Sequence, residues 1–261
     1  MAVSRSLWLA FRRHVHSHLR GAALSVALLA VVAALPAGPW RNGGWTLGAL
    51  LLLYYGYVLL ALGGTVLGWA AELRRKAQHV WGGSMVIGLF LATGSATATA
   101  VLCLVQAGFA QLARTLPQLK LLHQLSLHRR DGTRSAGELL FPLALGATAV
   151  WAGTPTAAWL CGALVLVFSD TAAALVGRQF GRLRFRTWGG TKSLEGSAAF
   201  FCSTVCIALG LAATQLGVMP AMAGLLALAA TLTAVEALAG MGTDNLAIPL
   251  TAAATWTWWM G

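Results

Sequence analysis

Two carboxylates and a group of cations lie between two long apolar segments of the chain. Asp170 directly follows one apolar run, Glu195 opens the next, and Arg178, Arg182 and Lys192 lie between them. A carboxylate in an apolar helix opposes membrane insertion by roughly 2.5 to 3.5 kcal/mol at the helix centre, so its presence indicates a function. Carboxylate oxygens suit Mg²⁺, and arginine and lysine neutralise phosphates. The pattern therefore predicts a site for metal-bound phosphates at a membrane surface.

The composition indicates that this site belongs to a membrane protein. Of the 261 residues, 58% are hydrophobic and only 10% are charged, which is too little polar surface for a soluble domain. We therefore predict an all-α, polytopic transmembrane helix bundle of about 8 to 9 membrane segments, each near the length that crosses the hydrocarbon core. The expected segments are 21–38, 45–70, 80–93, 95–113, 137–153, 156–176, 194–213, 217–238 and 246–260.

The basic residues predict the orientation of the chain. If the N-terminus is cytosolic and stretch 80–113 crosses twice, segments 1–20, 72–79, 114–136 and 177–193 face the cytosol. They contain every lysine and arginine except Arg41, as the positive-inside rule requires. The break at Thr93-Gly94-Ser95 would divide stretch 80–113 into two crossings or a re-entrant element. We expect an integral protein of the inner or plasma membrane whose site faces the cytosol.

The net charge of +11 lies in these short segments and not on a soluble domain, so no nucleic-acid partner is expected. A membrane lipid and an anionic substrate are the expected partners. The run Gly-Gly-Thr-Lys-Ser at 189–193 is similar to half of a nucleotide-binding P-loop. It lacks the leading glycine spacing and the preceding strand, so we reject that interpretation.

Longer motifs resemble the membrane lipid-alcohol kinases that use CTP, a family that includes dolichol kinase, phytol kinase and the fungal diacylglycerol kinase. The resemblance rests on SDTAAALVGR (169–178), FGR (180–182) and KSLEGS (192–197). Shorter pieces add support: ELRRKAQH (72–79), GELLFPL (137–143), and Glu236 with DNLAIPL (244–250). Together they span roughly residues 72 to 250.

The resemblance implies Mg²⁺-dependent transfer of the terminal phosphoryl group of CTP, or of another nucleoside triphosphate, to the hydroxyl of a membrane lipid alcohol. The acceptor would be a polyprenol, dolichol, phytol or diacylglycerol; the motifs specify neither the lipid nor an oligomeric state. Residues 71–261 would form the catalytic membrane domain. Residues 1–70, which carry no recognised motif, would form a basic cytosolic segment and two transmembrane helices.

The resemblance also implies roles for individual residues. The implied catalytic residues are Asp170, Lys192, Glu195, Lys76 and His79; the nucleotide-binding residues are Arg178, Gly181, Arg182, Gly190, Lys192, Ser193 and Asn245; and the metal ligands are Asp170, Glu195, Glu236 and Asp244. The three-residue spacing of Lys76 and His79 places both on one helical face, where they could contact a common anion. Arg184 lies outside the matched motifs and is expected to contribute little.

Two alternatives use these residues differently. Phosphatidate cytidylyltransferase, which makes CDP-diacylglycerol from CTP and phosphatidate, shares the Asp, Gly-Arg-x-Phe-Gly and Lys-x-x-Glu-Gly elements. Its pattern has an aromatic residue between the lysine and the glutamate, where this chain has Ser193-Leu194, and the Arg-Lys-x-x-His element favours the kinases. A transporter or channel is the other alternative, but its intramembrane charges would be spaced through the bilayer and not gathered at one face.

Overall fold

The computed structural model describes residues 5–115, 136–152, 157–187, 190–216, 222–240 and 242–260. The expected segment 114–136 lies almost entirely outside these ranges. The α-helices are α1 (Arg5–Ala33), α2 (Pro39–Val66), α3 (Ala71–Thr93), α4 (Ala96–Thr115), α6 (Gly137–Ala152), α7 (Ala157–Leu164), α8 (Asp170–Phe180), α9 (Leu194–Leu211), α10 (Met222–Leu238) and α11 (Asp244–Met260). A π-helical turn, η1 (Val165–Ser169), joins α7 to α8, and a second, η2 (Ala212–Leu216), extends α9.

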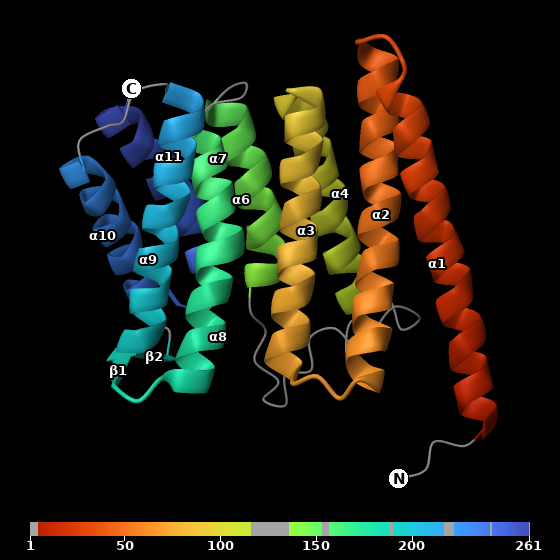
Figure 1. The fold of residues 1–261 in the computed structure, drawn as a ribbon, viewed down its shortest axis with the longest axis horizontal. Coiled ribbons are helices and arrows are strands. Elements are labelled where there is room, and N and C mark those ends of the chain that lie inside the picture. The colour runs from red at the N-terminus through yellow and green to blue at the C-terminus, as the bar shows by residue number, and fades with distance from the viewer. Residues whose placement is uncertain are drawn as a thin grey trace. The chain divides into compact units, whose positions relative to one another are not determined.

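The helical fold that the sequence predicts is confirmed, with one addition. Strands β1 (Arg184–Thr187) and β2 (Gly190–Ser193) form an antiparallel hairpin between α8 and α9, where we expected only a loop. Helices α1 and α3 also begin earlier than expected, because the basic stretches that precede their apolar parts are helical too. Figure 1 shows the hairpin at the end where α8 finishes and α9 begins.

Several helix ends follow from local sequence. Pro39 lies in the first turn of α2, where its missing N–H costs no hydrogen bond. Gly94 ends α3 with a φ of +60°, a conformation that favours glycine. Ser95 then accepts a hydrogen bond from the Ala98 N–H at 3.1 Å and starts α4. The predicted break at 93–95 is therefore a helix boundary.

The chain forms two compact units. The N-terminal unit contains Met1–Met85 and Leu112–Asp131, and the C-terminal unit contains Val86–Gln111 and Gly132–Gly261. In the N-terminal unit, α1 packs along α2. The Trp81 indole on α3 donates to the main-chain oxygen of Leu52 on α2 at 3.2 Å.

The C-terminal unit has a core of tightly packed helices. Helix α11 packs on α6, α7 and α10, and α9 packs on α8 and α10. Gly162 of α7 lies so close to the backbone of Pro249 on α11 that an added Cβ would come within 2.9 Å of its carbonyl oxygen. The buried ring of Trp159 packs on Phe90, with ring centroids 4.1 Å apart.

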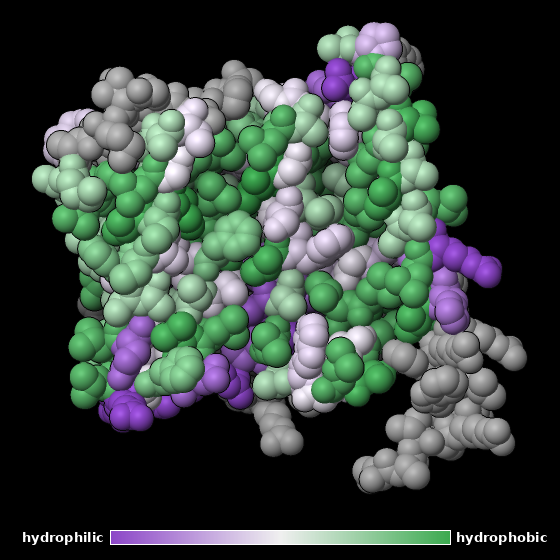
Figure 2. Space-filling view, in the orientation of Figure 1, coloured by the Kyte–Doolittle hydropathy of each residue, from purple (hydrophilic) through white to green (hydrophobic). Residues whose placement is uncertain are grey.

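Length and hydropathy support membrane insertion. Among the described residues, three helical stretches are long and apolar enough to span a bilayer: Arg41–Val66, Ala157–Phe180 and Leu194–Thr214. Shorter apolar helices run over His18–Ala33, Ala96–Leu112, Gly137–Ala152 and Met222–Leu238. On the face shown in Figure 2, hydrophilic residues gather at the hairpin end of α8 and α9, while the helix shafts are mostly hydrophobic. The number of crossings and the cytosolic orientation stay predictions.

Candidate functional site

The site is built around a close crossing of α8 and the start of α9. Ser193 caps α9, because its hydroxyl accepts a hydrogen bond from the Gly196 N–H at 3.1 Å. A Cβ added to Gly196 would lie 2.8 Å from the Ala173 main-chain oxygen, and one added to Gly177 would lie 2.9 Å from the Ser193 hydroxyl oxygen. The glycines of this motif therefore allow two helices to pack closely around a buried serine.

Glu195 holds the connection between α8 and the hairpin. Its Oε1 atom accepts hydrogen bonds from the backbone N–H groups of Arg182 at 2.9 Å and Leu183 at 3.1 Å. The backbone N–H of Leu194 donates to the Leu183 carbonyl oxygen at 2.8 Å. Glu195 Oε2 is buried and, within the described part of the chain, has no hydrogen-bond partner. The carboxylate thus fixes the loop that carries the next basic side chains.

A basic pocket opens beside this loop. It has a volume of about 470 Å³ and is lined by Arg178, Gln179, Phe180, Gly181, Arg182, Arg184 and Glu195. The three arginines are exposed to solvent. Guanidinium groups bind phosphate oxygens in a bidentate manner, so this pocket is suited to an anion with several oxygens. Three residues predicted to bind nucleotide, Arg178, Gly181 and Arg182, thus share one pocket with Glu195.

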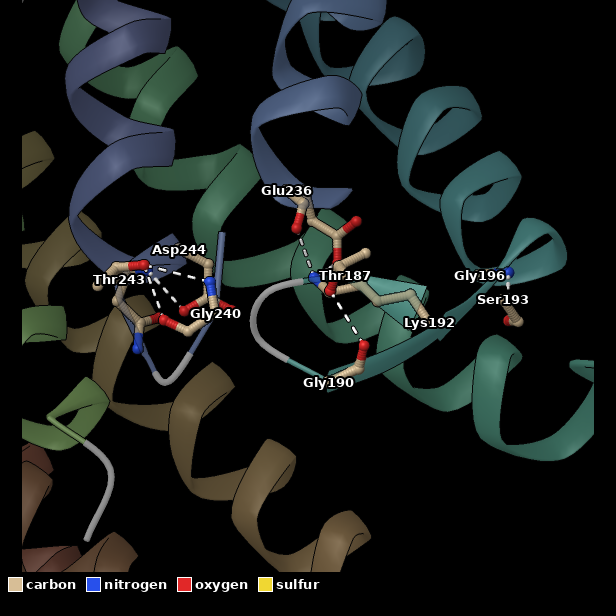
Figure 3. Close-up of polar contacts among 10 residues, drawn as sticks. Thr187, Gly190, Lys192, Ser193, Gly196, Glu236, Gly240, Thr243 and Asp244 are labelled. Atoms are coloured by element: carbon tan, nitrogen blue, oxygen red, sulfur yellow. Dashed lines mark hydrogen bonds and ion pairs between the residues drawn. The ribbon is translucent and has the colours of Figure 1, made fainter. Parts of the chain in front are cut away.

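Lys192 belongs to a second cluster, on the other face of the hairpin. Arg184 pairs with Ser193 and Phe185 pairs with Lys192 across the two strands, so Arg184 and Lys192 lie on opposite faces. Figure 3 shows Lys192 reaching from β2 to the end of α10, where Nζ forms an ion pair with the Glu236 carboxylate. It also donates to the main-chain oxygen of Glu236. The last carbonyls of a helix lack partners within the helix, and a lysine there is favourable.

Two further carboxylates interact electrostatically with the Glu236 side of this ion pair. Glu236 is only 4% exposed, and its Oε2 atom has no hydrogen-bond partner within the described residues. The charges of Asp170, at the start of α8, and Asp244, at the start of α11, both act on Glu236. In the described part of the chain, no three His, Cys, Asp or Glu side chains form a complete metal site. The oxygen donors nevertheless fit Mg²⁺, which commonly takes one or two carboxylates together with substrate phosphates.

Other predicted site residues have clear structural partners. Gly190 adopts a φ of +137°, and its carbonyl oxygen accepts a hydrogen bond from the Thr187 hydroxyl at 3.2 Å, so it shapes the hairpin turn. Asn245 is buried and donates through Nδ2 to the main-chain oxygen of Gly137 at 3.1 Å. This bond joins the start of α11 to the start of α6. It brings together two motifs that are far apart in the sequence.

Lys76 and His79 lie on α3 in the N-terminal unit. Lys76 is only 2% exposed and His79 is partly exposed. Their neighbour Arg75 forms an ion pair with Glu72 at 2.5 Å, and Arg74 donates to the Thr65 hydroxyl at 2.9 Å. These two arginines therefore have local structural roles, whereas the catalytic role of Lys76 and His79 stays a prediction.

Comparison with known proteins agrees with the motifs. The chain is similar to a phytol kinase of Synechocystis sp., with 29% identity over 186 residues that cover 69% of this chain and 76% of that protein. The similarity supports membership of the lipid-alcohol kinase family. No protein-family model matches the chain, and no solved structure matches it.

Arg184, which lies outside the matched motifs, is part of the basic pocket. It follows the matched motif by two residues, and its Nε donates to the Gly181 carbonyl oxygen at 3.3 Å. Gln179, which lies inside the matched region, lines the same pocket. The alternation of a β-strand could have revealed Arg184, because an antiparallel hairpin places it opposite Ser193 of the motif.

Proposed function

We propose that the protein is a membrane kinase that transfers the terminal phosphoryl group of CTP to the hydroxyl of a lipid alcohol. The observation that carries this proposal is the basic pocket of Arg178, Arg182 and Arg184 next to a hairpin whose other face carries Lys192, among acidic residues. The similarity to a phytol kinase supports a lipid acceptor and a nucleotide donor. Phytol is therefore the first alcohol to test, followed by polyprenols, dolichol and diacylglycerol.

In this proposal, the basic side chains of the site bind the phosphates. Arg178, Arg182 and Arg184 are exposed around the pocket and bind the phosphate oxygens of the nucleotide. Glu195 keeps their loop in place through two backbone hydrogen bonds. The compact ammonium group of Lys192 stabilises the negative charge that spreads over the transferring phosphoryl group. In phosphoryl transfer, such positioning and charge stabilisation supply most of the catalysis.

The metal ligands of this proposal are Asp170, Glu236 and Asp244. Glu195 can contribute only Oε2, because Oε1 already accepts two backbone hydrogen bonds. These side chains would hold Mg²⁺, which would supply neutralisation of the phosphate charge. The carboxylates have a second role in this arrangement, since Glu236 holds Lys192 at the end of α10.

The proposed reaction is a direct transfer of one phosphoryl group. The hydroxyl oxygen of the lipid forms a bond to the terminal phosphorus of CTP, the bond from that phosphorus to the bridging oxygen breaks, and CDP leaves. The hydroxyl proton passes to solvent or to a nearby base, and the loose transition state of phosphoryl transfer places little demand on that base. The products are a lipid monophosphate and CDP.

The position of a radiolabel in CTP tests the proposal. Purified protein in detergent or nanodiscs receives Mg²⁺, phytol, farnesol, undecaprenol or diacylglycerol, and CTP labelled at either the γ- or the α-phosphorus. We expect γ-label in the lipid and release of CDP, with slower transfer from ATP or GTP. Transfer of the α-phosphorus label to added phosphatidate, with release of pyrophosphate from CTP, would instead establish a cytidylyltransferase.

Asp170→Asn tests the metal role separately. A phosphoryl-transfer centre that loses a charged ligand typically loses several kcal/mol of transition-state stabilisation. We expect less than about a tenth of wild-type turnover at saturating CTP, with normal membrane insertion and thermal stability. Turnover near the wild-type value would remove Asp170 from the metal site.

A further inference from the structure

The helical stretch that ends in α8 changes its winding immediately before Asp170. Helix α7 is regular, η1 follows with the wider π-helical winding from Val165 to Ser169, and α8 begins at Asp170. One residue inserted into an α-helix rotates everything after it by about 100°, since 3.6 residues make one turn. The π-helical turn therefore decides the direction in which Asp170 points. Such turns are frequent at functional sites.

A buried pair of hydroxyls holds this turn against the neighbouring helix. Ser169, the last residue of η1, and Thr204 of α9 are both 0% exposed. The Thr204 hydroxyl donates to the Ser169 hydroxyl oxygen at 3.1 Å. Val165, Leu166 and Val167 in the same turn are fully buried, so water cannot replace a lost partner. A buried hydroxyl without a partner costs free energy, which gives this single hydrogen bond control over the local register.

The register of α8 on α9 is thus fixed at two levels. At the hairpin end, Gly177 and Gly196 allow α8 and α9 to approach each other closely. Deeper in the unit, Ser169 and Thr204 form the hydrogen bond one residue before Asp170. Asp170 is 8% exposed, and its charge interacts electrostatically with Glu236, the partner of Lys192. A rotation of the π-helical turn would move this carboxylate away from that cluster.

We propose that Ser169 and Thr204 are positioning residues that orient Asp170 toward the Glu236 and Lys192 pair. This inference rests on the proposed function, because it assigns Asp170 to the metal ions of phosphoryl transfer. Residues that orient metal ligands typically contribute 10- to 100-fold to metal affinity or activity. The hydroxyl pair therefore affects metal affinity and turnover, and it leaves the binding of the lipid alcohol unchanged.

The test removes the hydroxyl and keeps the shape. Thr204→Val should lower kcat by about 10-fold or more and weaken Mn²⁺ binding to the CTP-loaded protein by a similar factor, as measured from the electron paramagnetic resonance signal of free Mn²⁺. The KM for the lipid alcohol should not change. Thr204→Ser keeps the hydroxyl and should restore both values. Ser203→Ala is the matched control, because within the described residues the Ser203 hydroxyl donates to the Ala199 and Phe200 carbonyls of its own helix.

Ser169→Ala provides a second variant if Thr204→Val folds poorly, and it should give the same shift in Mn²⁺ affinity. Wild-type Mn²⁺ affinity and kcat in both variants would overturn the inference. Reduced thermal stability with normal Mn²⁺ affinity would also overturn it, because the pair would then be purely structural. An inactive Asp170→Asn protein beside a fully active Thr204→Val protein refutes the positioning role alone. An active Asp170→Asn protein refutes the metal role as well.

Discussion

Lys192 has a structural and a proposed catalytic role in one side chain. Its ammonium bonds to both the carboxylate and the main-chain oxygen of Glu236, so it completes the last turn of α10. Both groups are largely shielded from solvent, with side-chain exposures of 21% for Lys192 and 6% for Glu236. A compact ammonium fits between two oxygens of one residue, whereas a planar guanidinium needs more room.

We predict that Lys192→Arg keeps the charge and loses most of the activity. The larger group must displace β2 or leave Glu236, and a displacement of about 1 Å at a reacting centre can cost about 100-fold. The measurement is kcat/KM for CTP, together with thermal stability in detergent. Arg186→Lys is the matched control, because Arg186 is exposed on the same hairpin and does not line the pocket. Equal tolerance at both positions would argue against phosphate binding by Lys192.

At the residue scale, the sequence predicted part of the grouping that the structure shows, since Lys192 lies on the other face of the hairpin from the arginine pocket. Motif spacing was enough to group Arg178, Gly181 and Arg182, which now line one pocket. The ion pair between Lys192 and Glu236 joins residues 44 positions apart and depends on how α9 and α10 pack. Ser193 was expected to bind nucleotide, and its hydroxyl is occupied as the cap of α9. Local sequence cannot distinguish a capping serine from a ligand-binding one.

At the scale of elements, the crossing of α8 and α9 supports both halves of the site. Gly196 is a point of close backbone contact, because a Cβ added there would lie 2.8 Å from the Ala173 main-chain oxygen. Backbone cannot move aside as a flexible side chain can. A larger residue there must separate the two helices, and the separation would shift Asp170 relative to Lys192.

We therefore predict that Gly196→Ala destabilises the protein by about 1 to 3 kcal/mol, as overpacking does in other cores. Gly210→Ala in the same helix is the control. Nothing lies within 4 Å of a Cβ at Gly210, so the higher helix propensity of alanine should leave stability equal or raise it by up to about 1 kcal/mol. Thermal unfolding in detergent compares the two variants. A Gly196→Ala protein as stable as wild type would show that the crossing can relax.

Helix boundaries were easier to predict than the hairpin and the π-helical turns. Gly94 and Ser95 are residues that typically separate helices, and α3 ends and α4 begins at this position as expected. Strand β1 has only four residues, two of them arginines, so it is too short and too polar to stand out as a strand in the sequence. The turn η1 consists of Val165, Leu166, Val167, Phe168 and Ser169, which would suit a regular helix equally well. The turn makes a tertiary contact that sequence alone does not reveal, the hydrogen bond of Ser169 with Thr204.

At the scale of the whole molecule, the distribution of basic residues predicts one shared cytosolic side. Single cysteines introduced at Thr133 and Arg186, in a variant whose native cysteines are replaced, should react with a membrane-impermeant maleimide only from the cytosolic face. A cysteine introduced at Asn42 should react only from the opposite face, because the positive-inside rule places the neighbouring Arg41 outside. Labelling in right-side-out and in inverted vesicles distinguishes the cytosolic face from the opposite face. Labelling of positions 133 and 186 from opposite faces would contradict this topology.

The exposure of the three pocket arginines has a consequence for how the proposed kinase activity depends on ionic strength. Charges open to water are screened over about 8 Å at 0.15 M salt, whereas buried pairs are screened much less. Arg178, Arg182 and Arg184 are exposed, and the ion pair of Lys192 with Glu236 is not. Added KCl should therefore raise the KM for CTP and leave kcat almost unchanged, as steady-state kinetics from 0.05 to about 0.5 M salt would measure. A parallel fall in kcat would mean that the salt also disrupts the buried pair.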